Sequence, residues 1–240
     1  MTYDLTRFGQ LLKEFDITLD IEQKEKFIRF YEILIEWNSF MNLTAITEFD
    51  QVIVKHFVDS LSIVKVLEIN NQKILDLGTG AGFPGIPIKI LFPDTSIVLV
   101  DSLNKRVQFL NHVIEELELG HITAIHGRAE DIARMPEYRE QFDLCVSRAV
   151  ANLATLSEYC IPFVKQKGLF ISYKAETADQ EISEAEKAIE LCGGNLEKKI
   201  SFLLPNTSYS RNLICIRKIS STKQQYPRKA GLPAKSPIGK

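Results

Sequence analysis

The sequence predicts a doubly wound α/β domain, in which a mainly parallel sheet is covered by helices on both faces. Two observations support this fold class. From residue 73 onward, short apolar runs alternate with amphipathic segments, and strands that are apolar on both faces and alternate with helices form parallel sheets. A glycine-rich turn directly follows the first apolar run, at the place where open α/β sheets bind ligands. A helical extension precedes this domain, and an antiparallel strand pair ends it.

Residues 1–66 are expected to form the helical extension. Apolar side chains recur there at helical spacing in three stretches, Phe8–Phe15, Phe27–Met41 and Ile53–Val64. Asp20 precedes the second stretch, and Gln23 lies three residues after Asp20, which is the pattern of a capping box. Because each helix has only one apolar face, the extension must pack on a larger body.

Residues 67–219 are expected to form the α/β domain. Five apolar runs are predicted as its parallel strands: Ile74–Leu77, Ile97–Asp101, Ile122–His126, Phe142–Ser147 and Leu169–Tyr173. Gly193 and Gly194 end the helix that follows the fifth run. Two further runs, near Ile200–Leu204 and Leu213–Ile216, are joined by only a short loop, which makes them antiparallel neighbours.

The composition is that of an ordinary globular protein, because 45% of the 240 residues are hydrophobic and 25% are charged. The longest apolar run has four residues, whereas a membrane span needs about twenty, so neither insertion nor secretion is expected. The four cysteines form no C-x-x-C pair, which argues against a zinc site and a disulfide framework. We therefore expect a cytoplasmic protein with reduced, buried cysteines and no metal.

The charge is unevenly distributed. Residues 217–240 contain seven cations and no acid, a net charge of +7, while the first 216 residues contain 22 cations and 31 acids, a net charge of −9. A basic tail on an acidic body indicates a polyanionic partner such as nucleic acid. A solvated tail without a ligand has the same composition, so charge alone leaves both interpretations open.

The strongest functional signal is the segment Ile74–Gly85, in which a strand runs into a glycine-rich turn and then a helix. Gly78, Gly80 and Gly82 alternate there, and glycine is needed where the backbone turns sharply and approaches a ligand. Asp101 ends the next strand, 23 residues after Gly78, where a carboxylate can accept hydrogen bonds from both hydroxyls of a ribose. These four residues predict a site for an adenosine-containing cofactor.

The order of the glycines distinguishes two classes of cofactor. Dinucleotide sites use G-x-G-x-x-G, so that a pyrophosphate rests on the helix N-terminus. Here the order is D-x-G-x-G-x-G, with Asp76 ahead of the glycines, and a carboxylate repels phosphate and attracts an ammonium group. S-adenosylmethionine carries an amino acid end in place of a pyrophosphate. The motif therefore favours S-adenosylmethionine, and an NAD-dependent oxidoreductase is the disfavoured alternative.

Two more loops are expected at the same edge of the sheet. Gly127–Asp131 follows the third strand, where a backbone N–H and a carboxylate can read the N1 acceptor and the amino donor of adenine. The same residues can equally cap a helix. Arg148 ends the fourth strand, and an arginine beside a buried strand indicates a carboxylate or phosphate partner.

Absent motifs narrow the reaction. No Asn/Asp-Pro-Pro-aromatic tetrapeptide of the kind found in amino-methylating enzymes of adenine and cytosine follows the fourth strand. Cys145 lies inside that strand and is expected in the core, not as a nucleophile. N7 of guanine has a free lone pair, so methyl transfer to it needs alignment and electrostatic help but no base. A site without an obvious general base is compatible with that target.

Motifs spread along the whole chain accompany the cofactor turn. They are Trp37-Asn38, Asn42–Ile46, His56–Ser60, Leu75–Ile90, Asp101–Arg106, Ser147–Ala149 and Tyr226–Gly231, with Pro233 and Lys235–Pro237. Together they closely resemble the RsmG (GidB) family of bacterial 16S rRNA guanine-N7 methyltransferases. Several of them lie outside the generic cofactor fold, which makes the resemblance specific.

The resemblance implies a Rossmann-like class I methyltransferase fold with S-adenosylmethionine as cofactor. It implies cofactor contacts from Gly78, Phe83, Ala129, Glu130 and Arg148. The implied substrate is one guanine in the 530 loop of 16S rRNA in the small ribosomal subunit, methylated on N7. Arg148 and Lys174 are the expected catalytic residues. The sequence has Ala175 after Lys174 where many relatives have glycine, so the role of position 175 stays open.

RNA contacts are expected from two groups of basic residues. Lys105 and Arg106 begin a helix, where cations are unfavourable to the helix dipole, and this conflict indicates contact with RNA phosphates. Residues 220–240 are expected to form a basic tail that packs on or near the active site. Arg228, Lys229 and Lys235 in this tail are expected to contact phosphates, because the tail has no apolar content with which to fold alone.

Two further alternatives stay open. His56 either packs against its own helix neighbours or touches the target base. The chain is either an active methyltransferase or a non-catalytic RNA-binding or ribosome assembly factor that keeps the cofactor site. The second alternative predicts RNA binding that falls steeply with salt, without methyl transfer.

Overall fold

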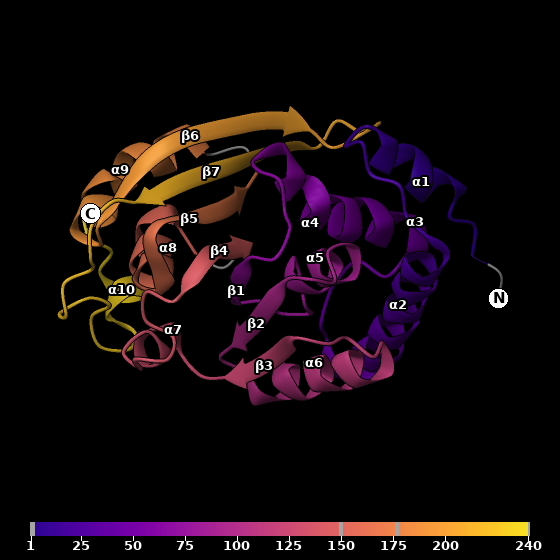
Figure 1. The fold of residues 1–240 in the computed structure, drawn as a ribbon, viewed down its shortest axis with the longest axis horizontal. Coiled ribbons are helices and arrows are strands. Elements are labelled where there is room, and N and C mark those ends of the chain that lie inside the picture. Colours follow the sequence, from indigo (N-terminus) through magenta and orange to yellow (C-terminus); the bar gives the residue numbers. More distant parts are fainter. Residues whose placement is uncertain (1–2, 149–150, 176–177, 240) are drawn as a thin grey trace.

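The computed structural model describes residues 3–148, 151–175 and 178–239 of the chain (Figure 1). Within these ranges, seven strands form one sheet in the order β3-β2-β1-β4-β5-β7-β6. They are β1 (Lys73–Leu77), β2 (Ser96–Asp101), β3 (Ile122–His126), β4 (Phe142–Arg148), β5 (Val164–Lys174), β6 (Gly194–Leu203) and β7 (Ser210–Lys218). Strands β1 to β5 pair in parallel, and β7 is antiparallel to both β5 and β6. The doubly wound class and the antiparallel pair are confirmed.

Two strands begin at least five residues earlier than expected. Strand β5 begins at Val164 instead of Leu169, and β6 begins at Gly194 instead of near Ile200. The added residues of β6 are mostly exposed and polar, because β6 is an edge strand that pairs only with β7. A search for apolar runs therefore misses them. Gly193 has φ 85°, which agrees with its predicted position at the end of a helix.

Helices and short helical turns surround the sheet. In chain order they are α1 (Thr6–Lys13), α2 (Ile21–Met41), α3 (Phe49–Val52), η1 (Ile53–Val58), α4 (Asp59–Leu61), η2 (Ser62–Lys65), α5 (Gly85–Leu91), α6 (Asn104–Glu116), α7 (Ala129–Ile132), α8 (Leu153–Cys160), η3 (Ile161–Phe163), α9 (Ala178–Leu191) and α10 (Leu232–Lys235). The capping box of α2 is confirmed: Gln23 N donates to Asp20 Oδ1 (2.8 Å) and Asp20 N donates to Gln23 Oε1 (3.1 Å). The third amphipathic stretch, Ile53–Val64, is divided into three short segments, η1, α4 and η2, and η1 is a π-helical turn that contains His56.

Two hydrophobic clusters cover the two faces of the sheet. On one face, strand residues such as Ile74 and Leu99 pack with α2, α5 and α6. On the other face, Leu75 and Cys145 pack with α8 and α9, which lie at the left of Figure 1. The helices of residues 3–65 share the first cluster, to which Phe57 contributes, so they are joined to the sheet through one continuous core.

All four cysteines are buried and free, as the sequence predicts. Along the described parts of the chain, no helix combines the length and the apolarity needed to cross a membrane. Among the same residues, no three His, Cys, Asp or Glu side chains are grouped as a metal site would require.

Candidate functional site

The turn between β1 and α5 is braced by Asp76. Its fully buried carboxylate accepts hydrogen bonds at Oδ2 from Thr79 Oγ1 (2.6 Å) and Gly85 N (2.8 Å). Its Oδ1 has no partner among the described residues, and burial raises the pKa of Asp76 to about 6. Gly78 and Gly80 have φ of 69° and 62°, in the left-handed region that favours glycine. The Asp76 side chain bonds to the turn itself and is fully buried, so a ligand cannot reach it. This corrects the interpretation that Asp76 attracts the ammonium group of a ligand.

A first cavity lies beside the carboxyl ends of β1, β2 and β3. It has a volume of about 200 Å³ and is lined by Leu77, Gly78, Val100, Asp101, Ser102, Gly127, Arg128, Ala129, Glu130 and Tyr159. The Glu130 side chain is almost fully buried, and its Oε1 accepts a hydrogen bond from Gly231 N (2.8 Å). Burial and the Glu130 carboxylate raise the pKa of Tyr159 to about 12. This cavity offers apolar side chains together with the carboxylates of Asp101 and Glu130.

A second cavity, of about 360 Å³, adjoins the first. It is lined by Leu43, Thr44, His56, Gly78, Thr79, Gly80, Ala81, Phe83, Asp101, Ser102, Arg106 and Arg148. Gly78, Asp101 and Ser102 belong to both cavities, so the two form one elongated cleft. The structure thus brings the predicted residues of the glycine turn, of the second strand and of the loop after the third strand to one place.

The Asp101 carboxylate stands at the junction of the two cavities. Its Oδ2 accepts hydrogen bonds from Gly80 N (3.0 Å) and Arg106 Nη1 (3.3 Å), and its Oδ1 accepts one from Leu103 N (2.9 Å). Each carboxylate oxygen has two lone pairs, so both oxygens keep limited capacity for further donors. Gly82 has a packing role instead, because a Cβ at this position would collide with the side chain of Ile86.

His56 lies against Phe83, with the ring centroids 4.5 Å apart and the planes 18° apart. Arg148 Nη2 lies 3.2 Å from His56 Nδ1, and because a guanidinium only donates, Nδ1 must accept. Nε2 then carries the proton and donates to Thr44 Oγ1 (2.9 Å). Burial and the charge of Arg148 lower the pKa of His56 to about 3, so the ring is neutral at pH 7. These contacts favour the packing interpretation of His56.

A third cavity lies on the other side of His56 and Arg148. It has a volume of about 270 Å³ and is lined by Lys55, His56, Asp59, Arg148, Tyr173, Lys174, Ala175 and Arg211. His56 and Arg148 also line the second cavity, so the two cavities adjoin there. Four cations around one aspartate make this the most cationic of the three cavities.

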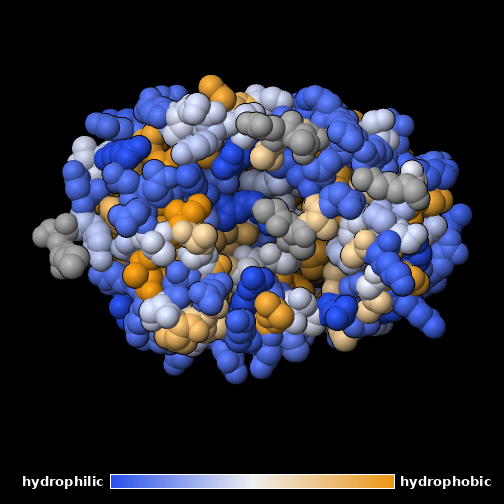
Figure 2. Space-filling model, turned by 180° about the vertical axis from the view of Figure 1, so that it is seen from behind, coloured by the Kyte–Doolittle hydropathy of each residue, from blue (hydrophilic) through white to orange (hydrophobic). Residues whose placement is uncertain are grey.

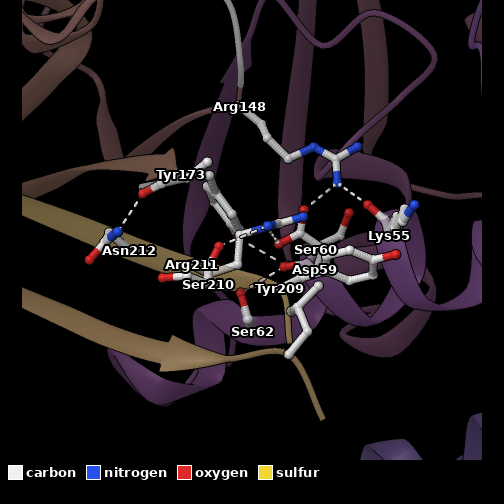
Figure 3. Close-up of polar contacts among 12 residues, drawn as sticks. Lys55, Asp59, Ser60, Ser62, Arg148, Tyr173, Tyr209, Ser210, Arg211 and Asn212 are labelled. Carbon is white, nitrogen blue, oxygen red and sulfur yellow. Dashed lines mark hydrogen bonds and ion pairs between the residues drawn. The ribbon is translucent and has the colours of Figure 1, made fainter. Parts of the chain in front are cut away.

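Asp59 organises the third cavity (Figure 3). Its side chain is 5% exposed, with Oδ2 3.0 Å from Arg148 Nη1 and Oδ1 2.9 Å from Arg211 Nε. Arg148 Nη1 also donates to the Lys55 carbonyl (3.2 Å). Lys174 pairs with Glu181, with Nζ and Oε2 2.8 Å apart. One buried carboxylate therefore orients two guanidinium groups toward the same cavity.

Sequence analysis missed Asp59 and Arg211. Asp59 belongs to the family motif His56–Ser60, which marks it as a candidate residue but does not indicate what its side chain does. Arg211 is on β7, and it shares the Asp59 carboxylate with Arg148 on β4 because only β5 lies between these two strands. That strand order cannot be read from the sequence, since a short loop shows only that β6 and β7 are paired.

The residues predicted to contact RNA have different surroundings. Arg106 pairs with Asp101 inside the cleft, whereas Lys105 is exposed, with Nζ 3.4 Å from the Met41 carbonyl. Arg228 forms an ion pair with the buried Glu158, at 2.7 Å between Nη2 and Oε2, and its contact with an RNA phosphate stays a prediction.

Lys229 and Lys235 are both exposed. The tail packs on the body of the protein, with Tyr226 and Pro233 buried, so it does contain apolar side chains. Ala149, part of the motif after β4, lies outside the described residues.

The face of the molecule opposite to the view of Figure 1 is mainly hydrophilic and hollowed near its middle (Figure 2).

Comparison with known families gives this site a context. The family GidB, described as rRNA small subunit methyltransferase G, matches residues 23–215. The chain belongs to this family. Among its relatives, the ribosomal RNA small subunit methyltransferase G of Lachnoclostridium phytofermentans is 53% identical over 236 residues, which cover 98% of each chain. The protein of the same name from Desulforamulus reducens is 53% identical over 237 residues, which cover 98% of this chain and 99% of the relative.

Solved structures agree on the fold. The methyltransferase chain in a complex with the Haloferax volcanii Trm112 activator superposes with a TM-score of 0.57 at 12% identity, over 78% of this chain and 98% of that chain. The YcgJ protein of Bacillus subtilis superposes with a TM-score of 0.52 at 14% identity, over 70% of this chain and all of that chain. Family and fold confirm the predicted Rossmann-like class I methyltransferase and S-adenosylmethionine as its cofactor.

Proposed function

We propose that this chain transfers a methyl group from S-adenosylmethionine to N7 of one guanine in the 530 loop of 16S rRNA, acting on the small ribosomal subunit in the cytoplasm. The observation that carries the proposal is the continuity of three cavities. The first two meet at Gly78 and Asp101 and form a cleft of two parts. The cation-lined third cavity meets this cleft at His56 and Arg148. The names of the relatives, ribosomal RNA small subunit methyltransferase G, support the substrate.

The two-part cleft fits a ligand with an adenosine end and an amino acid end. Ala129 and Glu130 line the first cavity, where a backbone N–H and a carboxylate suit the N1 and amino groups of adenine. Asp101, at the junction, suits the ribose hydroxyls. Gly80 lines the second cavity, and a Cβ at this position would meet no protein atom within 4 Å, so its backbone is open to a ligand. When bound there, the cofactor supplies an electrophilic methyl group on a sulfonium.

The third cavity is the proposed place of the target nucleotide. Lys55, Arg148, Lys174 and Arg211 line it, and such a group of cations attracts the phosphate of a nucleotide. Arg148 lines both this cavity and the cofactor cleft, so it is placed to align the acceptor with the methyl group. We assign the catalytic roles to Arg148 and Lys174 on this basis.

The described residues around the third cavity include no free general base at neutral pH. His56 is neutral, but its Nδ1 already accepts a hydrogen bond from Arg148. Asp59 is occupied by Arg148 and Arg211. An acceptor that must lose a proton would need such a base, whereas N7 of guanine offers its lone pair directly. The chemistry of this cavity therefore favours N7 over an amino group.

The RNA-binding surface is proposed to include Lys105, Lys229 and Lys235. All three side chains are exposed, and Lys105 is next to Arg106, which lines the cofactor cleft. Phosphate contacts by such lysines bind RNA without reading its sequence, and they weaken as salt rises. Recognition of the target guanine is assigned to the third cavity.

The test is transfer of labelled methyl from S-adenosylmethionine to small subunits purified from a strain that lacks this protein, followed by mapping of the modified nucleotide. We expect one N7-methylguanine in the 530 loop. Subunits from the parent strain are the matched control and should accept no label, because their site is already methylated. RNA binding without transfer would overturn the proposal in favour of a non-catalytic assembly factor.

A further inference from the structure

The C-terminal strap, defined here as residues 226–236, crosses the end of the molecule next to α7 and α8. In Figure 1 its helix α10 lies beside these two helices. Arg139 donates to the carbonyls of Thr222 (2.8 Å) and Tyr226 (3.1 Å), which fixes the chain as it enters the strap. Thr155 Oγ1 donates to the Pro233 carbonyl (3.0 Å), which fixes it on α8.

One ion pair anchors the middle of the strap. Glu158, on α8, has a side chain that is 1% exposed, and a buried carboxylate needs partners. Arg228 supplies three of them: its backbone N (2.6 Å) and Nε (2.9 Å) donate to Oε1, and Nη2 (2.7 Å) donates to Oε2. Nη2 also donates to the Ser236 carbonyl (2.9 Å), so the same guanidinium ties the end of the strap to its beginning.

The strap reaches the first cavity three residues after this anchor. Gly231 N donates to Oε1 of Glu130 (2.8 Å), and Glu130 lines the cavity with Ala129 and Tyr159. Gly231 has φ 84°, a conformation that points its N–H where most residues could not. The position of the Glu130 carboxylate therefore depends on a backbone donor about 100 residues later in the chain.

We propose that the strap is a working part of the cofactor site: Arg228, locked on Glu158, holds Gly231 so that its N–H positions the Glu130 carboxylate for the amino group of adenine. This rests on the proposed placement of the adenosine end in the first cavity. Arg228 and Gly231 are positioning residues, because they act through Glu130. The amide of Gly231 uses one lone pair of Oε1, which restricts the directions left to a ligand donor.

Charge-assisted, bidentate pairs are the geometrically specific ones, so loss of the Arg228 guanidinium should release the strap more than loss of any single neutral contact. The neighbouring Lys229 is exposed and provides a matched control, since it carries the same charge on the same segment. If the Arg228–Glu158 pair had only a structural role, the Arg228 variants would lose stability without any change in how the site distinguishes adenine from hypoxanthine.

The experiment is calorimetric titration of the full-length protein with S-adenosylhomocysteine and with S-inosylhomocysteine, in which the amino group is replaced by a carbonyl. We expect the wild type and Lys229→Ala to prefer the adenine compound by the same factor. Arg228→Ala should bind it about tenfold more weakly and lose most of that preference. Arg228→Lys, which keeps the charge without the bidentate pair, should lie between them.

The outcomes separate the two proposals. If the wild type binds S-adenosylhomocysteine without preferring adenine to hypoxanthine, the placement of adenine beside Glu130 is wrong. If the wild type shows the preference and Arg228→Ala retains it in full, the role of the strap is refuted. Should Arg228→Ala fail to fold, Arg228→Lys decides in its place, and an unchanged preference in that variant refutes the role equally.

Discussion

Replacement of Asp59 by asparagine removes the charge that holds two arginines in the third cavity. The Asp59 side chain is 5% exposed, and its partners Arg148 and Arg211 have side chains that are 14% and 20% exposed. Breaking a buried ion pair by removing one partner costs roughly 3–5 kcal/mol, because a charge is left buried and unpaired. Both guanidinium groups retain some contact with water, so we expect the lower end of this range, about 3 kcal/mol.

The assay is urea unfolding of the wild type, Asp59→Asn and Asp50→Asn. Asp50 forms a surface pair with Arg7 (3.0 Å), with side chains 59% and 46% exposed, and such a pair contributes less than about 1 kcal/mol. In the same proteins, Asp59→Asn should reduce methyl transfer to small subunits, because Arg148 loses its orientation, while Asp50→Asn should not. If both variants lose the same free energy of unfolding, the reasoning about the buried network is refuted.

Three further predictions concern the cofactor turn and the RNA surface. Gly80→Ala should destabilise the fold by about 1 kcal/mol, because φ is 62° there, and should weaken binding of S-adenosylhomocysteine several-fold; unchanged binding would show that the turn does not approach the ligand. Burial raises the pKa of Asp76 from 3.8 to about 6, so the native state holds a proton that the unfolded state has lost. Stability should therefore fall by roughly 2 kcal/mol between pH 4 and 6.5 relative to Asp76→Asn, and parallel urea-derived curves for the two proteins would contradict this. Lys229→Ala and Lys235→Ala should each reduce the slope of log K against log salt for RNA binding by about 1, and unchanged slopes would remove these lysines from the RNA surface.

The fold could be predicted from the sequence where periodicity is strong. The buried strands such as Ile74–Leu77 and the capping box at Asp20 are local patterns, and the structure confirms them. The start of β6 and its place at the edge could not be predicted, because an exposed edge strand has no apolar signature.

The candidate site likewise contains residues that could be predicted from the sequence and residues that could not. Gly78, Gly80 and Asp101 are recognisable because each lies at a fixed offset from a strand. The pairing of Arg211 with Asp59 joins residues 152 positions apart, and the pairing of Arg228 with Glu158 joins residues 70 positions apart. Such pairs depend on strand order and on the path of the tail, which composition does not reveal. A basic tail therefore suggested phosphate contacts for Arg228, although a buried carboxylate of the same chain provides its partner.

The placement of the cofactor in the two-part cleft is the central claim, and a crystal structure of the protein with S-adenosylhomocysteine tests it most directly. The account predicts adenine in the first cavity beside Ala129 and Glu130, the ribose at Asp101 and the amino acid end along Gly80. The sulfur should then face the side of the cleft where Arg148 lies. A ligand bound in the reverse direction, or outside the cavities that share Gly78 and Asp101, would contradict it.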